Sequence, residues 1–152
     1  MSHQWSKLRP VSKLEQLAET IQKTAFLLSD NHDVIQSYVN HTGANFRVIN
    51  RVGESEFDVL CKQINIEKTN YAFVKKSDLE RGLRKDLWIG LVLYVDGAKP
   101  EKFLFPSTVW NDLNNLFTDS TFKHHEYGIN LNKETIHILK EEYSFAEQIQ
   151  SI

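Results

Sequence analysis

The stretch Leu87-Trp-Ile-Gly-Leu-Val-Leu-Tyr-Val95 is the most apolar run in the chain. Its residues are apolar at successive positions and not only at alternate ones, which is typical of a strand buried on both faces. Asp96-Gly97 follows it and predicts a turn, and Lys102–Phe105 predicts a strand that returns beside it. We therefore expect a central β-sheet in which this stretch is an interior strand.

The segment before this strand predicts one helix and then several strands. Ser12 and Glu15 form an S-x-x-E capping box, and apolar residues then recur at helical spacing as far as Leu28. Turn residues separate the four strand candidates that follow, which are Val34–Val39, Asn45–Val52, Phe57–Ile66 and Tyr71–Val74. The second and third candidates are close enough in sequence to form a hairpin.

The rest of the chain predicts helices mixed with strands. A short helix is expected over Ser77–Lys85, with Ser77 as its cap. A longer one is expected from Pro106 through Phe117, and its inner face would carry Trp110, Leu113, Leu116 and Phe117. Tyr127–Leu131 predicts a short strand, and Asn132 can cap a last helix that contains Ile136, Leu139 and Tyr143. The fold class is therefore α/β (α+β), with a mixed central β-sheet flanked by helices in a single domain over residues 1–152.

Composition narrows the class of protein further. The chain has 152 residues, of which 41% are hydrophobic and 25% charged, which excludes a disordered or fibrous chain. Its single cysteine cannot form an intrachain disulfide. No run approaches the length of a membrane span and no signal peptide is recognisable, so we expect a soluble cytoplasmic protein with no membrane partner. A net charge of −2 weakens the case for nucleic-acid binding, but a local cleft can be basic on a neutral protein.

Two stretches carry a resemblance to a known family. They are His41-Thr-Gly43-Ala-Asn45-Phe46 and Phe57-Asp-Val-Leu60-Cys61-Lys62. Together they resemble a small bacterial branch of the restriction-endonuclease-like, PD-(D/E)XK superfamily. In that branch an Asp at a strand start is followed by a strand of the form apolar-Asp-apolar-Gln/Glu-apolar-Lys. The resemblance covers most of the chain, because Asn70–Lys76, Leu87–Gly97, Phe103–Trp110 and His125–Leu131 are also similar to that branch.

The resemblance implies a site that has lost two of its three groups. In the superfamily an Asp and a Glu hold Mg²⁺, and the Lys orients water or stabilises the transition state. Here Lys62 is retained, while Asn45 stands at the Asp position and Leu60 at the Glu position. Asn45 brings no negative charge to a metal, and Leu60 brings neither charge nor a ligand atom.

Two other carboxylates could rebuild part of such a site. Glu19 lies on the first predicted helix, as helix glutamates sometimes do at superfamily sites, and Asp58 shares a strand face with Lys62. The candidate catalytic residues, in a vestigial or rearranged site, are therefore Lys62, Asn45, Glu19 and Asp58. No metal ligand set is assigned, and no cofactor is expected unless the site is active, in which case it would use Mg²⁺ or Mn²⁺.

Simpler interpretations of the same residues stay open. Lys62 could be a strand lysine that reaches solvent or pairs with Asp58 or Glu56. Asn45 could be a turn residue at a strand start. The alternation of side chains along the strand predicts that Cys61 points into the core, where a nucleophilic role is not expected.

Three functions follow from these observations. The first is a catalytically degenerate nuclease-fold protein that binds nucleic acid or a partner without cutting. The second is a protein-interaction module with no nucleic-acid contact, and the third is a Mg²⁺-dependent nuclease with carboxylates rearranged from Glu19, Asp58 and Glu56. Possible partners are DNA, another protein, or a second copy of the chain paired through strand edges in Val34–Val74. The footprint expected for nucleic acid joins Lys62 with Lys75, Lys76, Arg81 and Arg84, although a mixed-sign run like this is most often a solvated face.

Overall fold

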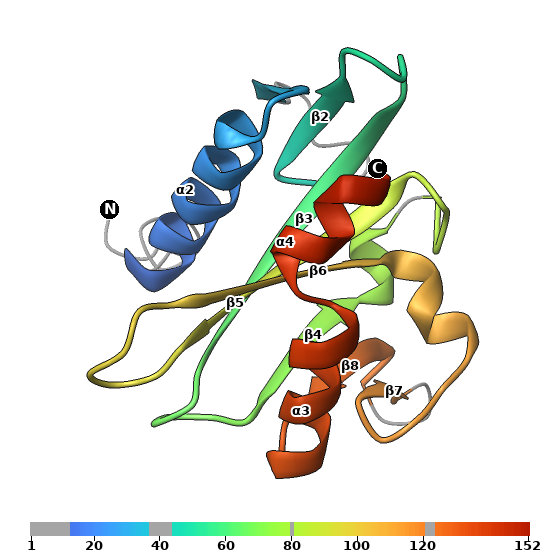
Figure 1. The fold of residues 1–152 in the computed structure, drawn as a ribbon. Helices are drawn as coiled ribbons and strands as arrows, with labels where there is room; N and C mark the ends of the chain where they lie inside the picture. Colours follow the sequence, from blue (N-terminus) through green and yellow to red (C-terminus); the bar gives the residue numbers. More distant parts are fainter. Residues whose placement is uncertain (1–12, 37–43, 80, 121–123) are drawn as a thin grey trace, which may run out of the picture.

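The expected central sheet is present and has five strands. The computed structural model describes residues 13–36, 44–79, 81–120 and 124–152. The strands lie in the order β1-β2-β3-β5-β6, with β3 and β5 parallel and the other neighbours antiparallel, so the sheet is mixed (Figure 1). Their bounds are His32–Gln36 for β1, Phe46–Asn50 for β2, Glu56–Asn65 for β3, Leu87–Tyr94 for β5 and Glu101–Pro106 for β6.

Two predictions about this sheet are confirmed. β5 is an interior strand between β3 and β6, and its consecutive residues Leu91 and Val92 are both fully buried. The second and third predicted strands form an antiparallel hairpin in which Phe46 lies opposite Val59. The apolar run at 87–95 therefore takes the buried position that its composition requires.

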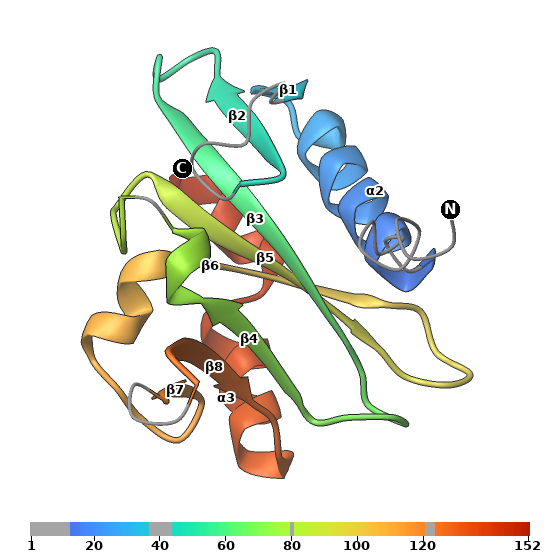
Figure 2. The ribbon, with the colours of Figure 1, turned by 180° about the vertical axis from the view of Figure 1, so that it is seen from behind.

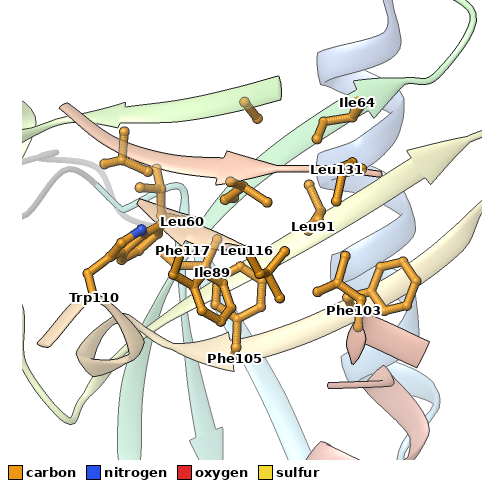
Figure 3. Close-up of a cluster of buried hydrophobic side chains, with 14 of the residues drawn as sticks. Leu60, Ile64, Ile89, Leu91, Phe103, Phe105, Trp110, Leu116, Phe117 and Leu131 are labelled. Atoms are coloured by element: carbon orange, nitrogen blue, oxygen red, sulfur yellow. The ribbon is translucent and has the colours of Figure 1, made fainter. Parts of the chain in front are cut away.

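A second sheet was not expected from the sequence. Three antiparallel strands lie in the order β4-β8-β7, where β4 is Tyr71–Lys75, β8 is Glu126–Asn130 and β7 is Phe117–Asp119. The prediction of a single sheet is wrong, because the strands predicted near 71–74 and 127–131 pair with each other. The second sheet packs on one face of the central sheet. The larger core fills the space between them, and ten of its side chains are labelled in Figure 3: Leu60, Ile64, Ile89, Leu91, Phe103, Phe105, Trp110, Leu116, Phe117 and Leu131.

The other face of the central sheet is covered by helices. α2 (Lys13–Leu28) packs against β1, β3 and β5, and the short α4 (Phe145–Gln148) packs against β6. Phe26 of α2 is fully buried between Phe46, Phe57 and Phe145, with ring centroids 4.8–5.9 Å away. Ser12, the predicted helix cap, lies outside the described residues. No helix in the described part of the chain is long and apolar enough to cross a membrane.

Two predicted helices are wrong in extent. In place of a helix over Ser77–Lys85 there is one 3-10 turn, Lys76–Asp78, and the chain then turns through Gly82 at a positive φ of 67°. That backbone conformation suits glycine and not a helix interior. In place of a helix through Phe117 there is a 3-10 helix at Ser107–Asn111.

The side chain of Asn114 explains why the second of these helices stops. Its oxygen accepts hydrogen bonds from the backbone N–H groups of Leu116 and Phe117, both at 2.8 Å. This local bond competes with helical pairing and turns the chain into β7. Leu113, expected on the inner face, is 53% exposed as a result.

The last predicted helix is confirmed as α3 (Lys133–Glu142). Asn132 caps it, because its side chain accepts from the N–H of Thr135 at 2.9 Å while the Thr135 hydroxyl accepts from the N–H of Asn132 at 2.8 Å. Leu139 is fully buried on its inner face.

Close approach of α2 to the sheet depends on Gly90. Gln22 of α2 is fully buried, and its side-chain amide donates to the carbonyl of Leu91 at 3.3 Å. A Cβ on Gly90 would lie 2.8 Å from the Gln22 side-chain carbon Cδ. We expect Gly90→Ala to lower the free energy of unfolding by about 1–3 kcal/mol, measured by urea denaturation, because the core is overpacked.

Gly53→Ala is a matched control for this change. A methyl group there meets Asn50 at 3.6 Å, an ordinary contact distance. In a Gln22→Ala background the Gly90→Ala cost should shrink, because the colliding side chain is gone. An equal cost in both backgrounds would contradict the explanation.

Candidate functional site

A pocket of about 510 Å³ lies at the edge of β3, between α2 and β4. Figure 2 shows these two elements on opposite sides of β3. We refer to this cavity as the β3-edge pocket. It is lined by Glu15, Gln16, Ala18, Glu19, Asn45, Cys61, Lys62, Gln63, Thr69, Tyr71, Ala72 and Phe73.

The pocket forms where β2 stops pairing with β3. Their register runs from Ile49 opposite Glu56 to Phe46 opposite Val59. Asn45 completes the pairing with one backbone and one side-chain bond. Its N–H donates to the carbonyl of Val59 at 2.8 Å, and its side-chain oxygen accepts from the N–H of Cys61 at 2.7 Å. Asn45 therefore acts as a strand-end residue at the pocket wall.

Lys62 enters the pocket from β3 and is partly buried. Its ammonium group lies 6.0 Å from the centre of the Phe73 ring. Burial lowers the pKa of Lys62. The charges of Asp78 and Glu15 act against that shift, and the charge of Lys75 adds to it. The interpretation that Lys62 pairs with Asp58 or Glu56 is wrong, because arginines hold both of those carboxylates.

The pocket brings together three of the four candidate catalytic residues. Glu19 reaches it from α2, beside Asn45 and Lys62, and forms an ion pair with Lys23 at 3.5 Å. Leu60 does not line it and is buried in the core between the two sheets. The position that holds a glutamate in the restriction-endonuclease-like pattern is therefore part of the hydrophobic core.

Asp58, the fourth candidate, lies outside the pocket. It is 7% exposed and accepts from Arg84 at 2.8 Å, with Arg47 at 3.6 Å. Arg84 also holds Asp86 at 2.7 Å, and this hydrogen bond lowers the pKa of Asp86. Asp58 and Arg84 therefore tie the start of β3 to the start of β5.

The cations proposed for a nucleic-acid footprint differ in their surroundings. Lys75 is exposed on β4, and Arg81 is exposed in the following turn. Lys76 forms an ion pair with Asp119 at 2.9 Å and lies 4.7 Å from the centre of the Tyr127 ring. Arg84 is committed to Asp58 and Asp86. Lys75 and Arg81 are the two of these four cations that remain most exposed.

Sequence reasoning missed the aromatic wall of the pocket. Phe73 is 40% exposed, and its ring stacks on that of Tyr71 with centroids 6.2 Å apart and planes at 24°. The Tyr71 hydroxyl donates to Glu126 at 2.6 Å; burial and, after it, this bond raise the pKa of Tyr71. Alternation in Tyr71–Lys75 places Tyr71, Phe73 and Lys75 on one strand face, a signal that was present in the sequence.

Gly128 makes room for this arrangement. A Cβ there would lie 2.6 Å from the Tyr71 ring, so a side chain on β8 would push Tyr71 away from Glu126. The absence of a side chain at Gly128 therefore leaves room for Tyr71 to reach Glu126.

Cys61 lies on the helix-facing side of β3 and packs against the cluster around Phe26. Burial, and after it the charge of Glu19, raise the pKa of its thiol. The thiolate is the nucleophilic form, so this environment disfavours nucleophilic chemistry at Cys61.

Gln63 is the other polar wall residue that the sequence did not indicate. Its carboxamide oxygen is buried and accepts no hydrogen bond from the described residues. An acceptor in this state has a strong preference for an N–H or O–H donor.

Within residues 13–36, 44–79, 81–120 and 124–152, no three His, Cys, Asp or Glu side chains gather as a metal-binding group. Comparison of the chain with protein-family models, with curated proteins and with solved structures gave no match.

Proposed function

We propose that this protein is a restriction-endonuclease-like protein of the PD-(D/E)XK type whose catalytic site has degenerated, and that it binds nucleic acid without cutting it. The observation that carries the proposal is the β3-edge pocket, which contains Lys62, Asn45 and Glu19 together. Residues brought by three separate segments meet there, and the lysine keeps its position on the strand. This grouping supports the proposal, whereas Leu60, at the position of the superfamily glutamate, is not part of the pocket.

The side chains in these positions do not fit the Mg²⁺ ions of an active superfamily site. Leu60 has no ligand atom and is buried in the core. The side-chain oxygen of Asn45 already accepts a backbone hydrogen bond, and Asp58 is held by Arg84. A hard divalent cation needs oxygen ligands with negative charge, and this chain has lost or redirected them. We therefore derive no metal-dependent step.

Positive charge near the pocket supports a nucleic-acid ligand. Lys62 lines the pocket and Lys75 is exposed on β4, while Asp78 and Glu15 influence the pKa of Lys62 more strongly than Lys75 does. Ammonium groups that are exposed or line a pocket can form charge-assisted hydrogen bonds with an anion. Phosphate groups of a nucleic acid would supply that anion.

The test is a fluorescence anisotropy titration of labelled single-stranded and duplex DNA over a salt series. We expect binding that weakens as salt rises, because phosphate contacts release counterions. Lys75→Glu should weaken binding and reduce the slope of log Kd against log salt by about one for the lost phosphate contact. Lys102→Glu, an exposed lysine on β6, is the control and should change little.

Each sample is then run on a denaturing gel after incubation with Mn²⁺. An intact strand supports the proposal, whereas cleavage would replace it with the rearranged nuclease. Absence of binding at low salt would overturn it and favour the protein-interaction alternative. Equal effects of Lys75→Glu and Lys102→Glu would show that the contact surface lies elsewhere.

A further inference from the structure

We infer that the β3-edge pocket receives one unpaired nucleotide of a single strand, with its base against Phe73 and its phosphate beside Lys62. The inference rests on the proposed nucleic-acid binding and specifies its ligand. Three features of the pocket carry it: an aromatic pair in which Phe73 is exposed, a partly buried lysine next to that pair, and hydrogen-bond acceptors on the opposite wall.

The aromatic pair offers a surface for a base. Phe73 is 40% exposed, although most large apolar side chains of the second sheet are buried, and Tyr71 supports its ring from one side. Tyr71 is itself fixed by its bond to Glu126. A rigid, exposed ring on a sheet is the feature on which proteins stack unpaired bases, because every base has a π-face.

The lysine is placed for the phosphate of the same nucleotide. The ammonium group of Lys62 lies over the Phe73 ring, 6.0 Å from its centre, so it is within reach of the phosphate of a nucleotide whose base contacts that ring. Among the described residues, no carboxylate lies within ion-pair distance of this ammonium group. Lys75, on the same strand face as Phe73, can meet the next phosphate along the strand.

The opposite wall favours a base edge over a backbone. Gln63 has a buried oxygen without a donor among the described residues, and Glu19 presents from α2 a carboxylate that also pairs with Lys23. Amino groups of cytosine, adenine or guanine are donors that such acceptors bind. The carboxylates of Glu15 and Glu19 repel phosphates, so the backbone must run on the β4 side and a duplex, with a second backbone, fits poorly.

An abasic strand provides the sharpest test, because it keeps every phosphate and removes the bases. We would measure the affinity of wild type and Phe73→Ala for a short deoxycytidine strand and for its abasic counterpart. Wild type should prefer the normal strand by about 5- to 150-fold, the range expected for one base stacked on an aromatic side chain. Phe73→Ala should lose that preference and bind the abasic strand as wild type does.

Two further variants separate stacking from folding and from charge. Phe73→Trp should keep the preference for the normal strand. The fluorescence of the introduced indole should be quenched when a base of the bound strand stacks on it. Lys62→Met should weaken both strands while the preference remains. Circular dichroism of Phe73→Ala should match that of wild type, since the side chain is partly exposed.

The outcomes distinguish this inference from the proposed function. Salt-sensitive binding with no preference for the normal strand, or a preference that Phe73→Ala retains, overturns the nucleotide pocket and leaves nucleic-acid binding intact. Failure of every strand to bind overturns both. Deoxycytidine monophosphate serves as a competitor: weak competition supports a strand as the ligand, whereas binding as tight as that of the strand would identify a free nucleotide instead.

Discussion

Replacing Arg84 by Met is expected to lower the free energy of unfolding by about 3–5 kcal/mol. Asp58 is 7% exposed and has its shortest ion pair, 2.8 Å, with Arg84. Removing the guanidinium leaves a buried carboxylate whose remaining cation, Arg47, is 3.6 Å away and more exposed. The cost arises mainly from that uncompensated charge and not from the value of the intact pair.

Urea denaturation of three variants tests this account. The double variant Asp58→Asn, Arg84→Met should recover much of the loss, because neither charge is then buried alone. Arg51→Met is the matched control, since its pair with Asp33 is 3.6 Å long and both side chains are more than half exposed. It should cost less than about 1 kcal/mol. A similar cost for Arg84→Met and Arg51→Met would contradict the prediction.

The same cluster has a consequence at low pH. The hydrogen bond from Arg84 lowers the pKa of Asp86 below its usual value of 3.8. A carboxylate with a lowered folded-state pKa stabilises the fold above its unfolded pKa, and that contribution is lost as the pH falls through the folded value. Acid denaturation curves of Arg84→Met should therefore lack this part of the pH dependence below about pH 4.

Phe26→Ala should be the most damaging change on the helix side of the sheet, with an expected loss of about 3–5 kcal/mol. Phe26 is fully buried, and its nearest ring, Phe145, is 4.8 Å away between centroids. The substitution leaves a cavity in the contact that fixes α2 to the sheet and α4. Because α2 forms one wall of the β3-edge pocket, the variant should also bind nucleic acid more weakly.

Leu28→Ala on the same helix separates this loss from a change in helix propensity. Leu28 is 79% exposed, so its truncation should shift stability by no more than about 0.5 kcal/mol. Thermal and urea unfolding of both variants give the comparison. Equal losses would mean that α2 does not depend on Phe26 for its attachment.

Local signals predicted most of the secondary structure. Short stretches of sequence predict three features that the structure contains. These are the strand in the apolar run at 87–95, the hairpin of β2 and β3, and the helix cap at Asn132. The failures occur where a local hydrogen bond from a side chain to the backbone, or an unusual backbone conformation, decides the outcome. The Asn114 side chain and the positive φ of Gly82 end two expected helices, and neither effect follows from hydrophobic periodicity.

The second sheet could not be predicted for a related reason. β4 pairs with β8, with Tyr71 opposite Asn130, and no turn signal connects strands so far apart in sequence. Without that pairing the position of Phe73 beside Lys62 cannot be inferred either. The resemblance grouped Glu19, Asn45 and Lys62, which the structure places around one pocket, but Asp58 was grouped by strand parity alone. The alternation of side chains along β3 predicts which face carries Asp58. It does not predict that arginines bind its carboxylate, as Arg84 does.

The long-range pairing of β4 with β8 also bears on the order of events during synthesis. β4 has its strand partner only after residues 126–130 have been made, whereas the β2–β3 hairpin is available much earlier. Contacts between distant segments form slowly because a long loop must close first. Neither wall of the β3-edge pocket is complete before β8 has been made, because the aromatic wall needs β8 and Phe26 of α2 packs against Phe145, which is made later still. Ligand binding at the pocket would therefore report that synthesis has passed both β8 and α4.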